Sequence, residues 1–218
     1  MPETAEERQK RRERNMVRLW CAPKIWLNNE CFILGGGPSL KHIDVGRLKG
    51  KRVIAVNNAY LLGEWIDVCF FNDMGWFRMH KTGLLGFAGL KVTTNIKCRN
   101  EPGIRVMCKR TSPYGIATDP GILSWNKSSG ACAINLAVHF GVRRIVLLGF
   151  DMQRVGDEAN WHRDHPNADR KKDPYAMFRR PFPYIGKALK RLNIECVNAT
   201  LGSALTEFPI VDPEDVLP

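Results

Sequence analysis

The sequence predicts an α/β fold, with a mostly parallel central sheet flanked by helices, on three observations. Short runs of β-branched, aromatic and other apolar residues alternate with segments of helical periodicity. Several of these runs end directly at glycine, asparagine or aspartate, as strands do at the ligand-binding edge of a parallel sheet. The first run, residues 32–34, passes through three glycines into a helical stretch, which is how many such folds hold phosphate.

Composition indicates one soluble globular domain. The chain has 218 residues, of which 44% are hydrophobic and 25% charged. No apolar run approaches the roughly 20 residues that a membrane span requires, and the polar N-terminus is unlike a secretory signal. The seven cysteines are scattered without a C-x-x-C pair. We therefore expect reduced thiols in a cytoplasmic protein, with Cys69 and Cys132 as core residues.

The net charge of +11 favours an anionic partner: a nucleotide, a nucleic acid or an acidic membrane surface. A basic surface without a specific partner explains the charge equally well. In the N-terminal segment the acidic residues come first and the basic residues later, with almost no apolar stripe. We expect residues 1–20 to form a charged, solvated helical arm and residues 21–218 to form a single domain. A nucleic-acid-binding arm is the alternative.

The glycine turn is the first candidate ligand site, and it consists of Gly35, Gly36, Gly37, Pro38 and Ser39. Glycines let a ligand approach the main chain closely. Proline suits a first helical position, and serine is a good N-cap with free N–H groups behind it. A tight turn without a ligand is the structural alternative. The segment matches neither the G-x-G-x-x-G fingerprint nor a P-loop, which disfavours a classical NAD site or a P-loop ATPase.

The next elements are a short helix over 39–48 and strands over 51–56 and 67–71. These strands stop at polar pairs, Asn57 with Asn58 and Asn72 with Asp73. Because the carboxyl ends of parallel strands share one edge, we expect these side chains to face the same crevice as the glycine turn. Asparagine both donates and accepts, which suits a base or ribose. Turn formation explains each residue equally well.

The middle of the chain continues this pattern. A helix is expected over 76–85, with Trp76, Phe77 and Met79 packed on the sheet, followed by strands over 90–94 and 104–108. Residues 109–127 contain glycine, proline and serine without a clear period, and we interpret them as a loop over the crevice that could act as a lid.

The strongest helix, 131–140, closes at Gly141. It follows Ser128, Ser129 and Gly130, a second helix start suited to an anion; an ordinary N-cap is the alternative.

A strand over 143–148 then ends at Gly149 and Asp151. The glycine allows close approach of a ligand. The aspartate could bind a ribose hydroxyl or a metal, or cap a local turn.

Residues 152–177 are polar and contain His162 and His165, with Asp164 between them. One hypothesis is a general base, since histidine titrates near neutral pH and a carboxylate can orient it. A metal site is disfavoured because no further cysteine or histidine joins the pair. A solvated loop is the structural alternative. Basic residues nearby could hold a phosphate or an acidic acceptor: Arg163, Arg170, Lys171, Lys172, Arg179 and Arg180.

The C-terminal part predicts an amphipathic helix over 182–192, with Ile185, Ala188, Leu189 and Leu192 facing inward. A last strand is expected over 194–197, and a turn-rich tail over 198–218.

Four segments in order carry a family resemblance: Leu-Gly-Gly-Gly-Pro-Ser-Leu, Val-Asn-Asn-Ala-Tyr, Ser-Ser-Gly with its helix, and Ile-Val-Leu-Leu-Gly-Phe-Asp. Together they resemble the Rossmann-like superfamily of bacterial sialyltransferases that use CMP-sialic acid. They also resemble the related 6-hydroxymethylpterin diphosphokinase-like domain of unknown function. Its phage-encoded members look similar in the Trp-His-x-Asp-His-Pro stretch and the Asn-x-x-x-Gly-Ser-x-Leu-x-x-Phe-Pro tail. The resemblance covers residues 31–209.

This resemblance implies a Rossmann-like fold and a nucleotide site. The family's contacts carry over to the glycine turn, Asn57, Ser129 with Gly130, and Gly149 with Asp151, and His162 or His165 matches its general base. The chain departs from the family at Gly36, where asparagine is usual, and at Met152 and Gln153, since tyrosines that help the phosphate leave follow this strand in the family.

We therefore expect a transferase that uses a nucleotide-activated donor, a CMP-sugar or another nucleotide sugar, with a histidine acting on an acceptor hydroxyl and no metal ligand. One alternative is an ATP-dependent diphosphokinase that acts on a pterin-like hydroxyl and needs Mg²⁺ at Asp73 or Asp151. Another is a non-enzymatic protein that binds a nucleotide or nucleic acid through its basic surface. The expected location is the cytoplasm, or the host cytoplasm for a phage protein.

Overall fold

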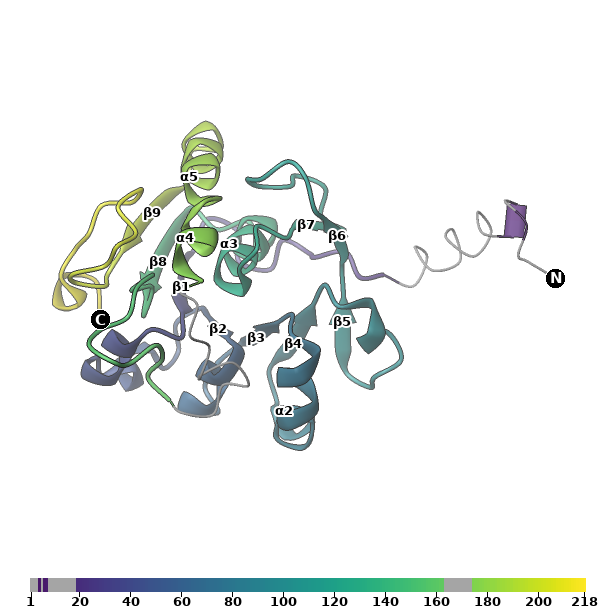
Figure 1. Cartoon of the computed structure of the whole chain (residues 1–218), viewed down its shortest axis with the longest axis horizontal. Helices are drawn as coiled ribbons and strands as arrows, with labels where there is room; N and C mark the ends of the chain where they lie inside the picture. The colour runs from purple at the N-terminus through teal and green to yellow at the C-terminus, as the bar shows by residue number, and fades with distance from the viewer. Residues whose placement is uncertain (1–3, 5, 8–18, 163–173) are drawn as a thin grey trace.

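The computed structural model describes residues 4, 6–7, 19–162 and 174–218. Seven parallel strands form the central sheet in the order β5-β4-β3-β2-β1-β8-β9, with helices on both faces (Figure 1). The predicted α/β class, the mostly parallel sheet and the Rossmann-like architecture are confirmed. Among the helices in the described part of the chain, none combines the length and apolar character that crossing a lipid bilayer requires.

The order of the strands creates a switch point in the middle of the sheet. The strands are β1 (Glu30–Leu34), β2 (Val53–Val56), β3 (Val68–Phe71), β4 (Leu90–Thr93), β5 (Ile104–Val106), β8 (Arg144–Leu148) and β9 (Glu195–Asn198). From β1 the chain adds strands outward through β5 in one direction, and it adds β8 and β9 in the other. Leu34 pairs with Ala55 of β2 on one side and with Leu148 of β8 on the other. Open α/β sheets bind ligands outside the carboxyl ends of such a reversal.

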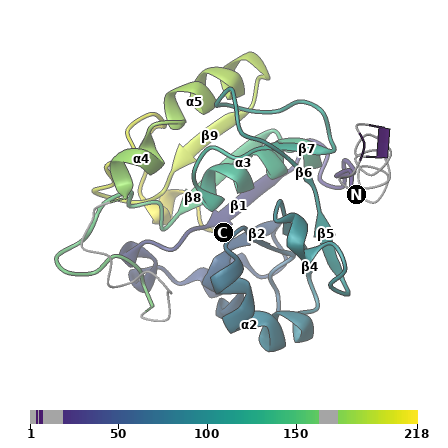
Figure 2. The same cartoon turned by 45° about the vertical axis from the view of Figure 1, so that its right-hand side comes forward.

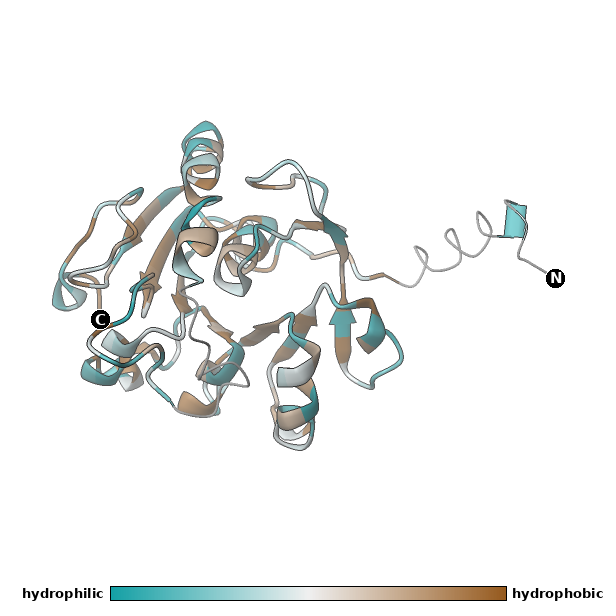
Figure 3. Ribbon diagram, in the orientation of Figure 1, coloured by the Kyte–Doolittle hydropathy of each residue, from teal (hydrophilic) through white to brown (hydrophobic). Residues whose placement is uncertain are grey.

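The two faces of the sheet build two hydrophobic clusters, because successive side chains of a strand point to opposite faces. Ile33 packs with α3 (Ser129–Phe140) and α5 (Phe182–Arg191), whereas Phe32 and Leu34 pack on the face covered by α2 (Met74–Gly86). Figure 2 shows α2 on one side of the sheet and α3 and α5 on the other. Hydrophobic residues concentrate on the strands between these layers (Figure 3).

The expected helix over 39–48 is wrong: the chain forms two 3₁₀ helices, η1 (Pro38–His42) and η2 (Val45–Leu48). The break occurs because Ile43 is extended, with φ −111° and ψ 125°. Asp44 then starts a new turn by accepting a hydrogen bond from the Gly46 N–H. Three further 3₁₀ helices follow other strands or lie in the tail: η3 (Asn57–Leu62), η4 (Ile96–Cys98) and η5 (Pro213–Asp215).

The strand expected over 104–108 is present but shorter, and the loop expected over 109–127 is wrong in that it contains further strands. The sheet strand β5 ends at Val106, and a separate pair of parallel strands follows, β6 (Cys108–Arg110) and β7 (Ile122–Ser124). Buried asparagine side chains hold the residues between β6 and β7. Asn126 accepts from the Gly115 N–H and donates to the Gly115 carbonyl, and Asn135 of α3 does the same with Ala117. A lid that opened as a whole would break these buried bonds.

Some smaller expectations also change. Trp76 and Phe77 are buried as predicted, but Met79 is 59% exposed and Leu192 is 40% exposed. Met79 lies outside the row of α2 residues that faces the sheet. Leu192 lies beyond the last residue of α5, so it does not belong to the buried stripe of that helix. A short helix not predicted from sequence, α4 (Tyr175–Arg179), precedes α5.

All seven cysteines lie in described residues and are free. Cys69 and Cys132 are fully buried, as predicted. Burial raises the pKa of the Cys132 thiol to about 12 and raises that of Cys69 further, so both are neutral core side chains.

Candidate active site

The glycine turn after β1 is bonded directly to the loop after β8, at the switch point of the sheet. The Gly37 N–H donates to the Gly149 carbonyl at 2.8 Å. A Cβ atom at Gly35 would lie 2.4 Å from the Gly149 oxygen, and one at Gly37 would lie 1.7 Å from Oδ2 of Asp151. The two loops approach so closely that no side chain fits between them, which explains the glycines without reference to a ligand.

Asp151 fills the helix start at Ser39. Its side chain is 3% exposed. Oδ1 accepts from the Ser39 N–H at 3.2 Å, and Oδ2 accepts from the Ser39 hydroxyl at 2.8 Å. Burial raises the pKa of the Asp151 carboxyl, and the bonds from Ser39 act in the opposite direction. The Ser39 N–H, which the sequence analysis assigned to a phosphate, is thus bonded to a carboxylate of the chain itself. This matches the two structural alternatives, a tight turn without a ligand at Ser39 and a capping role for Asp151.

The C-terminal tail fixes the loop after β8 from the other side. The Phe150 N–H donates to the Thr200 hydroxyl, and the Ser203 hydroxyl donates to the Phe150 carbonyl at 2.6 Å. The Ala204 N–H donates to the Asp151 carbonyl at 2.9 Å. Sequence reasoning assigned no role to Thr200 or Ser203, although both lie in the Asn-x-x-x-Gly-Ser tail motif.

The start of α3 lies beside this joint, and its N-cap residue leaves it uncapped. The Ser128 side chain forms no capping bond to the N–H groups of the first turn. A Cβ atom at Gly130 would lie 2.8 Å from the ring of Phe150, and one at Gly35 would lie 3.0 Å from the same ring. The Phe150 ring therefore separates the glycine turn from the start of α3, and the two helix starts are neighbours. The first turn of a helix carries N–H groups without partners inside the helix.

The polar residues after β2 and β3 divide into two groups. Asn58 is 1% exposed and accepts from the Trp76 indole N–H at 2.5 Å, while Asp73 accepts from the Trp76 backbone N–H at 2.8 Å and caps α2. Both side chains thus serve the fold in this structure. Asn57 is different: its backbone is left-handed, with φ 53°, and its buried Oδ1 has no hydrogen-bond partner among the described residues.

Asn72 ties the sheet to α3. Its Oδ1 accepts from the N–H and the hydroxyl of Thr94, at 3.1 Å and 2.8 Å. Its Nδ2 donates to Sγ of Cys132 in the first turns of α3, at 3.6 Å. The carboxyl ends of β3 and β4 are therefore joined to the same end of α3 that meets Phe150.

The late polar loop returns to the glycine turn. The Trp161 N–H donates to the Gly36 carbonyl at 3.0 Å, and the rings of Trp161 and His162 lie 4.9 Å apart. Lys41, just after the glycine turn, pairs with Glu158 of the same loop at 2.5 Å. His162 is thereby placed beside the glycine turn. His165 and the basic residues at 163 and 170–172 lie outside the described residues.

The described residues bring together no group of three histidine, cysteine, aspartate or glutamate side chains that could hold a metal ion. Asp73 and Asp151, the two carboxylates considered for Mg²⁺, each accept hydrogen bonds from the chain itself.

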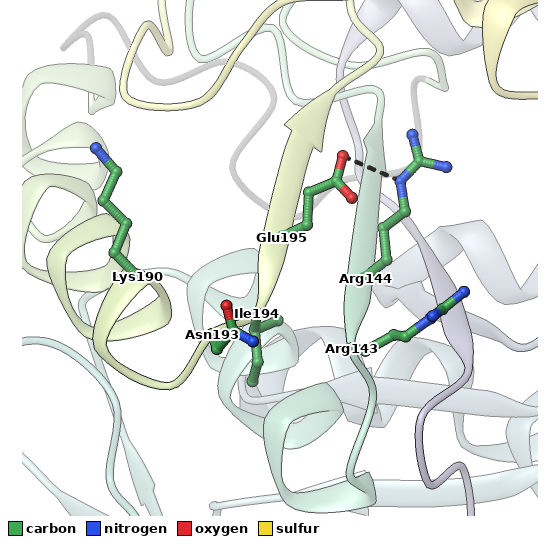
Figure 4. Close-up of a pocket in the computed structure, with 6 residues that line it drawn as sticks. All are labelled: Arg143, Arg144, Lys190, Asn193, Ile194 and Glu195. Carbon is green, nitrogen blue, oxygen red and sulfur yellow. Dashed lines mark ion pairs between the residues drawn. The ribbon is translucent and has the colours of Figure 1, made fainter.

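A basic hollow of about 570 Å³ lies at the opposite edge of the sheet (Figure 4). It is lined by Arg143, Arg144, Lys190, Asn193, Ile194 and Glu195. Arg144 pairs with Glu30 at 2.6 Å and with Glu195 at 3.3 Å. Figure 4 shows Lys190 and Arg143 pointing away from each other on either side of β9, so their charges do not converge on one ligand.

Comparison with known proteins gives a likeness in structure only. No family model matches the sequence, and no curated protein matches it. The Maf glycosyltransferase from Magnetospirillum magneticum AMB-1 superimposes with a TM-score of 0.64 at 13% identity. That match covers 93% of this chain but only 38% of the larger protein.

Two structures of the sialyltransferase CstII from Campylobacter jejuni are also similar, each at 17% identity. The complex with cytidine-5'-monophosphate has a TM-score of 0.52 over 85% of both chains. The complex with CMP-3FNeuAc has a TM-score of 0.50 over 84% of this chain and 86% of that chain. At these identities the matches establish the fold that the chain shares with these proteins.

Proposed function

We propose that this chain is a glycosyltransferase that uses a nucleotide-activated sugar as donor and binds the nucleotide outside the carboxyl ends of β1 and β8. The observation that carries the proposal is the uncapped start of α3, which lies at the switch point beside the glycine turn. The fold supports it, because glycosyltransferases are among the solved structures that share it and two of these hold CMP or a CMP-sugar analogue.

In this proposal the start of α3 binds the phosphate of the donor. Its free N–H groups and the positive end of the helix dipole favour an anion. Negative charge grows on the leaving nucleotide as the bond from sugar to phosphate breaks, so the same groups stabilise the transition state. Asn57, with its unsatisfied Oδ1, can accept a hydrogen bond from the base or ribose.

His162 is the proposed general base. It lies beside the glycine turn, where an acceptor could meet the sugar. Neutral imidazole takes the proton of the acceptor hydroxyl as the oxygen attacks the sugar carbon, and the nucleotide leaves with the electrons of the bond to phosphate. His165 stays a second candidate for this role from the sequence alone. The proposed transfer needs neither a metal nor a redox cofactor.

The test combines binding with turnover. Wild-type protein is heated with CMP, UDP, GDP and ADP, and is then assayed for nucleotide release from the matching sugar conjugates. One nucleotide should raise the melting temperature, because a ligand that binds only the folded form stabilises it. The variant His162→Gln should keep that shift and lose about 100-fold or more in turnover. The control is His42→Gln at an exposed histidine.

Unchanged turnover in His162→Gln would remove the base assignment. No binding of any nucleotide, and no turnover of any sugar conjugate, would remove the proposed function. An activity with ATP that EDTA abolishes would instead identify a diphosphokinase.

A further inference from the structure

Two lysines contact one tryptophan immediately before α3. Nζ of Lys127 lies 4.4 Å from the centroid of the Trp125 ring, and Nζ of Lys109 lies 4.8 Å from it. Since both distances are measured to the same ring, the two ammonium groups lie within about 9 Å of each other, close to the screening length of about 8 Å at physiological ionic strength. Each contact is a cation–π interaction, but the two positive charges repel.

No carboxylate of the described residues forms an ion pair with either lysine. Within the part of the chain that the structure describes, the ion pairs involve Lys41, Arg47, Lys81 and Arg144, and neither Lys109 nor Lys127 takes part in one. Two cations that share a ring without a counter-ion create a local positive potential, which an anionic ligand would relieve.

The backbone on both sides fixes where these lysines lie. Asn126 and Lys127 are both left-handed, with φ 50° and 59°, a conformation that costs free energy for residues other than glycine. Asn126 is 1% exposed and locked by its two bonds to Gly115. On the other side Lys109 pairs with Leu123 in the ladder between β6 and β7, so Lys109 lies on the strand face that Leu123 and Trp125 share.

The pair lies beside the start of α3, at the carboxyl edge of the main sheet. The Cys132 thiol donates to the Trp125 carbonyl at 2.9 Å and accepts from Asn72 after β3. Because Lys109 contacts the ring of Trp125 and the carbonyl of Trp125 is bonded to Cys132, Lys109 lies near the first turns of the helix. The lysines thus lie beside the start of α3, where the proposed nucleotide site is.

We propose that Lys109 and Lys127 form an anion-binding subsite that holds a phosphate or carboxylate group of the substrate. The identity of that substrate rests on the proposed function, a nucleotide-activated sugar. Phosphate would come from the nucleotide, and carboxylate would come from an acidic sugar. Trp125 orients both ammonium groups, so that neither must be ordered when the ligand arrives.

The experiment compares charged and uncharged ligand pairs on one double variant, Lys109→Gln with Lys127→Gln. Calorimetry measures the affinity for CMP against cytidine, for N-acetylneuraminic acid against its methyl ester, and for pyrophosphate alone. The double variant should bind at least one charged probe 10-fold or more weakly, with the affinity for its uncharged partner unchanged. A loss of affinity for CMP would show that the subsite binds phosphate, and a loss of affinity for N-acetylneuraminic acid would show that it binds carboxylate. Lys109→Arg with Lys127→Arg should retain most of the affinity.

The control removes the same charge elsewhere, with Lys51→Gln and Lys190→Gln at exposed lysines of the opposite edge. The inference would be overturned if the control lost as much affinity for the charged probes as the double variant does. It would also be overturned if the double variant kept the wild-type ratio of charged to uncharged affinities. Failure of every anionic probe to bind wild-type protein at millimolar concentration would overturn it as well. If the protein turns over a nucleotide sugar but the double variant keeps its affinities, the subsite is refuted and the proposed function is retained. If pyrophosphate binds through the two lysines but no nucleotide sugar is turned over, the subsite is retained and the proposed function is refuted.

Discussion

The two helix starts at the centre of the sheet differ in what occupies them. At Ser39 the N–H and hydroxyl are both bonded to the buried carboxylate of Asp151, and the neighbouring glycines are pressed against Gly149. At Ser128 the side chain caps nothing, and Lys127, the preceding residue, lies with Lys109 against the Trp125 ring. One junction is a joint between two loops, and the other has an N-cap residue that makes no capping bond.

A glycine-rich turn and an anion site are therefore separate properties of a chain. Glycines are required wherever two main chains approach closely, whether or not a ligand follows. A helix start offers an anion site only when no side chain of the protein already satisfies it. Changes at the closed joint should therefore alter stability, and changes at the uncapped start should alter binding.

Gly37→Ala should have the largest effect. Its Cβ would lie 1.7 Å from Asp151 Oδ2 and 2.7 Å from the Gly149 carbonyl, so the joint must separate. We expect a loss of about 3 kcal/mol or more in the free energy of unfolding, measured by urea denaturation. Gly86→Ala in α2 is the control, because nothing lies within 4 Å of its added Cβ. Equal stability of the two variants would show that the joint is not tightly packed.

Matched serine variants compare the junctions directly. Ser39→Ala removes one hydrogen bond to a buried carboxylate and should cost about 2 kcal/mol of stability. Ser128→Ala removes no capping bond and should change stability by less than about 0.5 kcal/mol. Denaturant titration of both proteins measures the difference. If the order were reversed, the assignment of closed and uncapped junctions would be wrong.

Ser128→Asp should separate stability from binding at the uncapped start. An aspartate there can cap the first turn and interact with the helix dipole, which should add about 1 kcal/mol of stability. The same negative charge should weaken nucleotide binding by about 10-fold or more, by repelling the phosphate. Ser128→Asn caps without charge and is the control for binding. If the aspartate variant binds the nucleotide as tightly as the wild type does, the phosphate does not bind at the start of α3.

The smallest effect concerns pH. Burial raises the pKa of Asp151 above its ordinary value, so the folded protein holds this proton more tightly than the unfolded chain does. Stability from this group is then greatest below the ordinary pKa of about 3.9 and falls as the pH rises toward the raised value. Asp151→Asn removes the titration. Between pH 4 and pH 7, the free energy of unfolding of the variant should rise steadily relative to that of the wild type. A constant difference, or a shift in favour of the wild type, would contradict the raised pKa.

Local pattern was sufficient for most of the sheet. Short apolar runs predicted β1 to β5, β8 and β9, since a buried parallel strand needs little more than that pattern to be recognised. The helix over 131–140 and the burial of Cys69 and Cys132 followed from periodicity and side-chain type. The segment between β6 and β7 did not, because buried asparagine side chains rather than a repeating pattern hold it.

Residue patterns along the chain were enough to predict the fold class, the edge of the sheet at which polar residues gather, and two serine-bearing helix starts there. Which of these starts is bonded to another part of the protein depends on the folded arrangement. Asp151 reaches Ser39 across 112 residues of chain, Ser203 holds the Phe150 carbonyl across 53, and Lys109 contacts the Trp125 ring from a strand of a separate small sheet. Such contacts depend on how distant segments pack, and no local rule for turns, caps or periodicity encodes them.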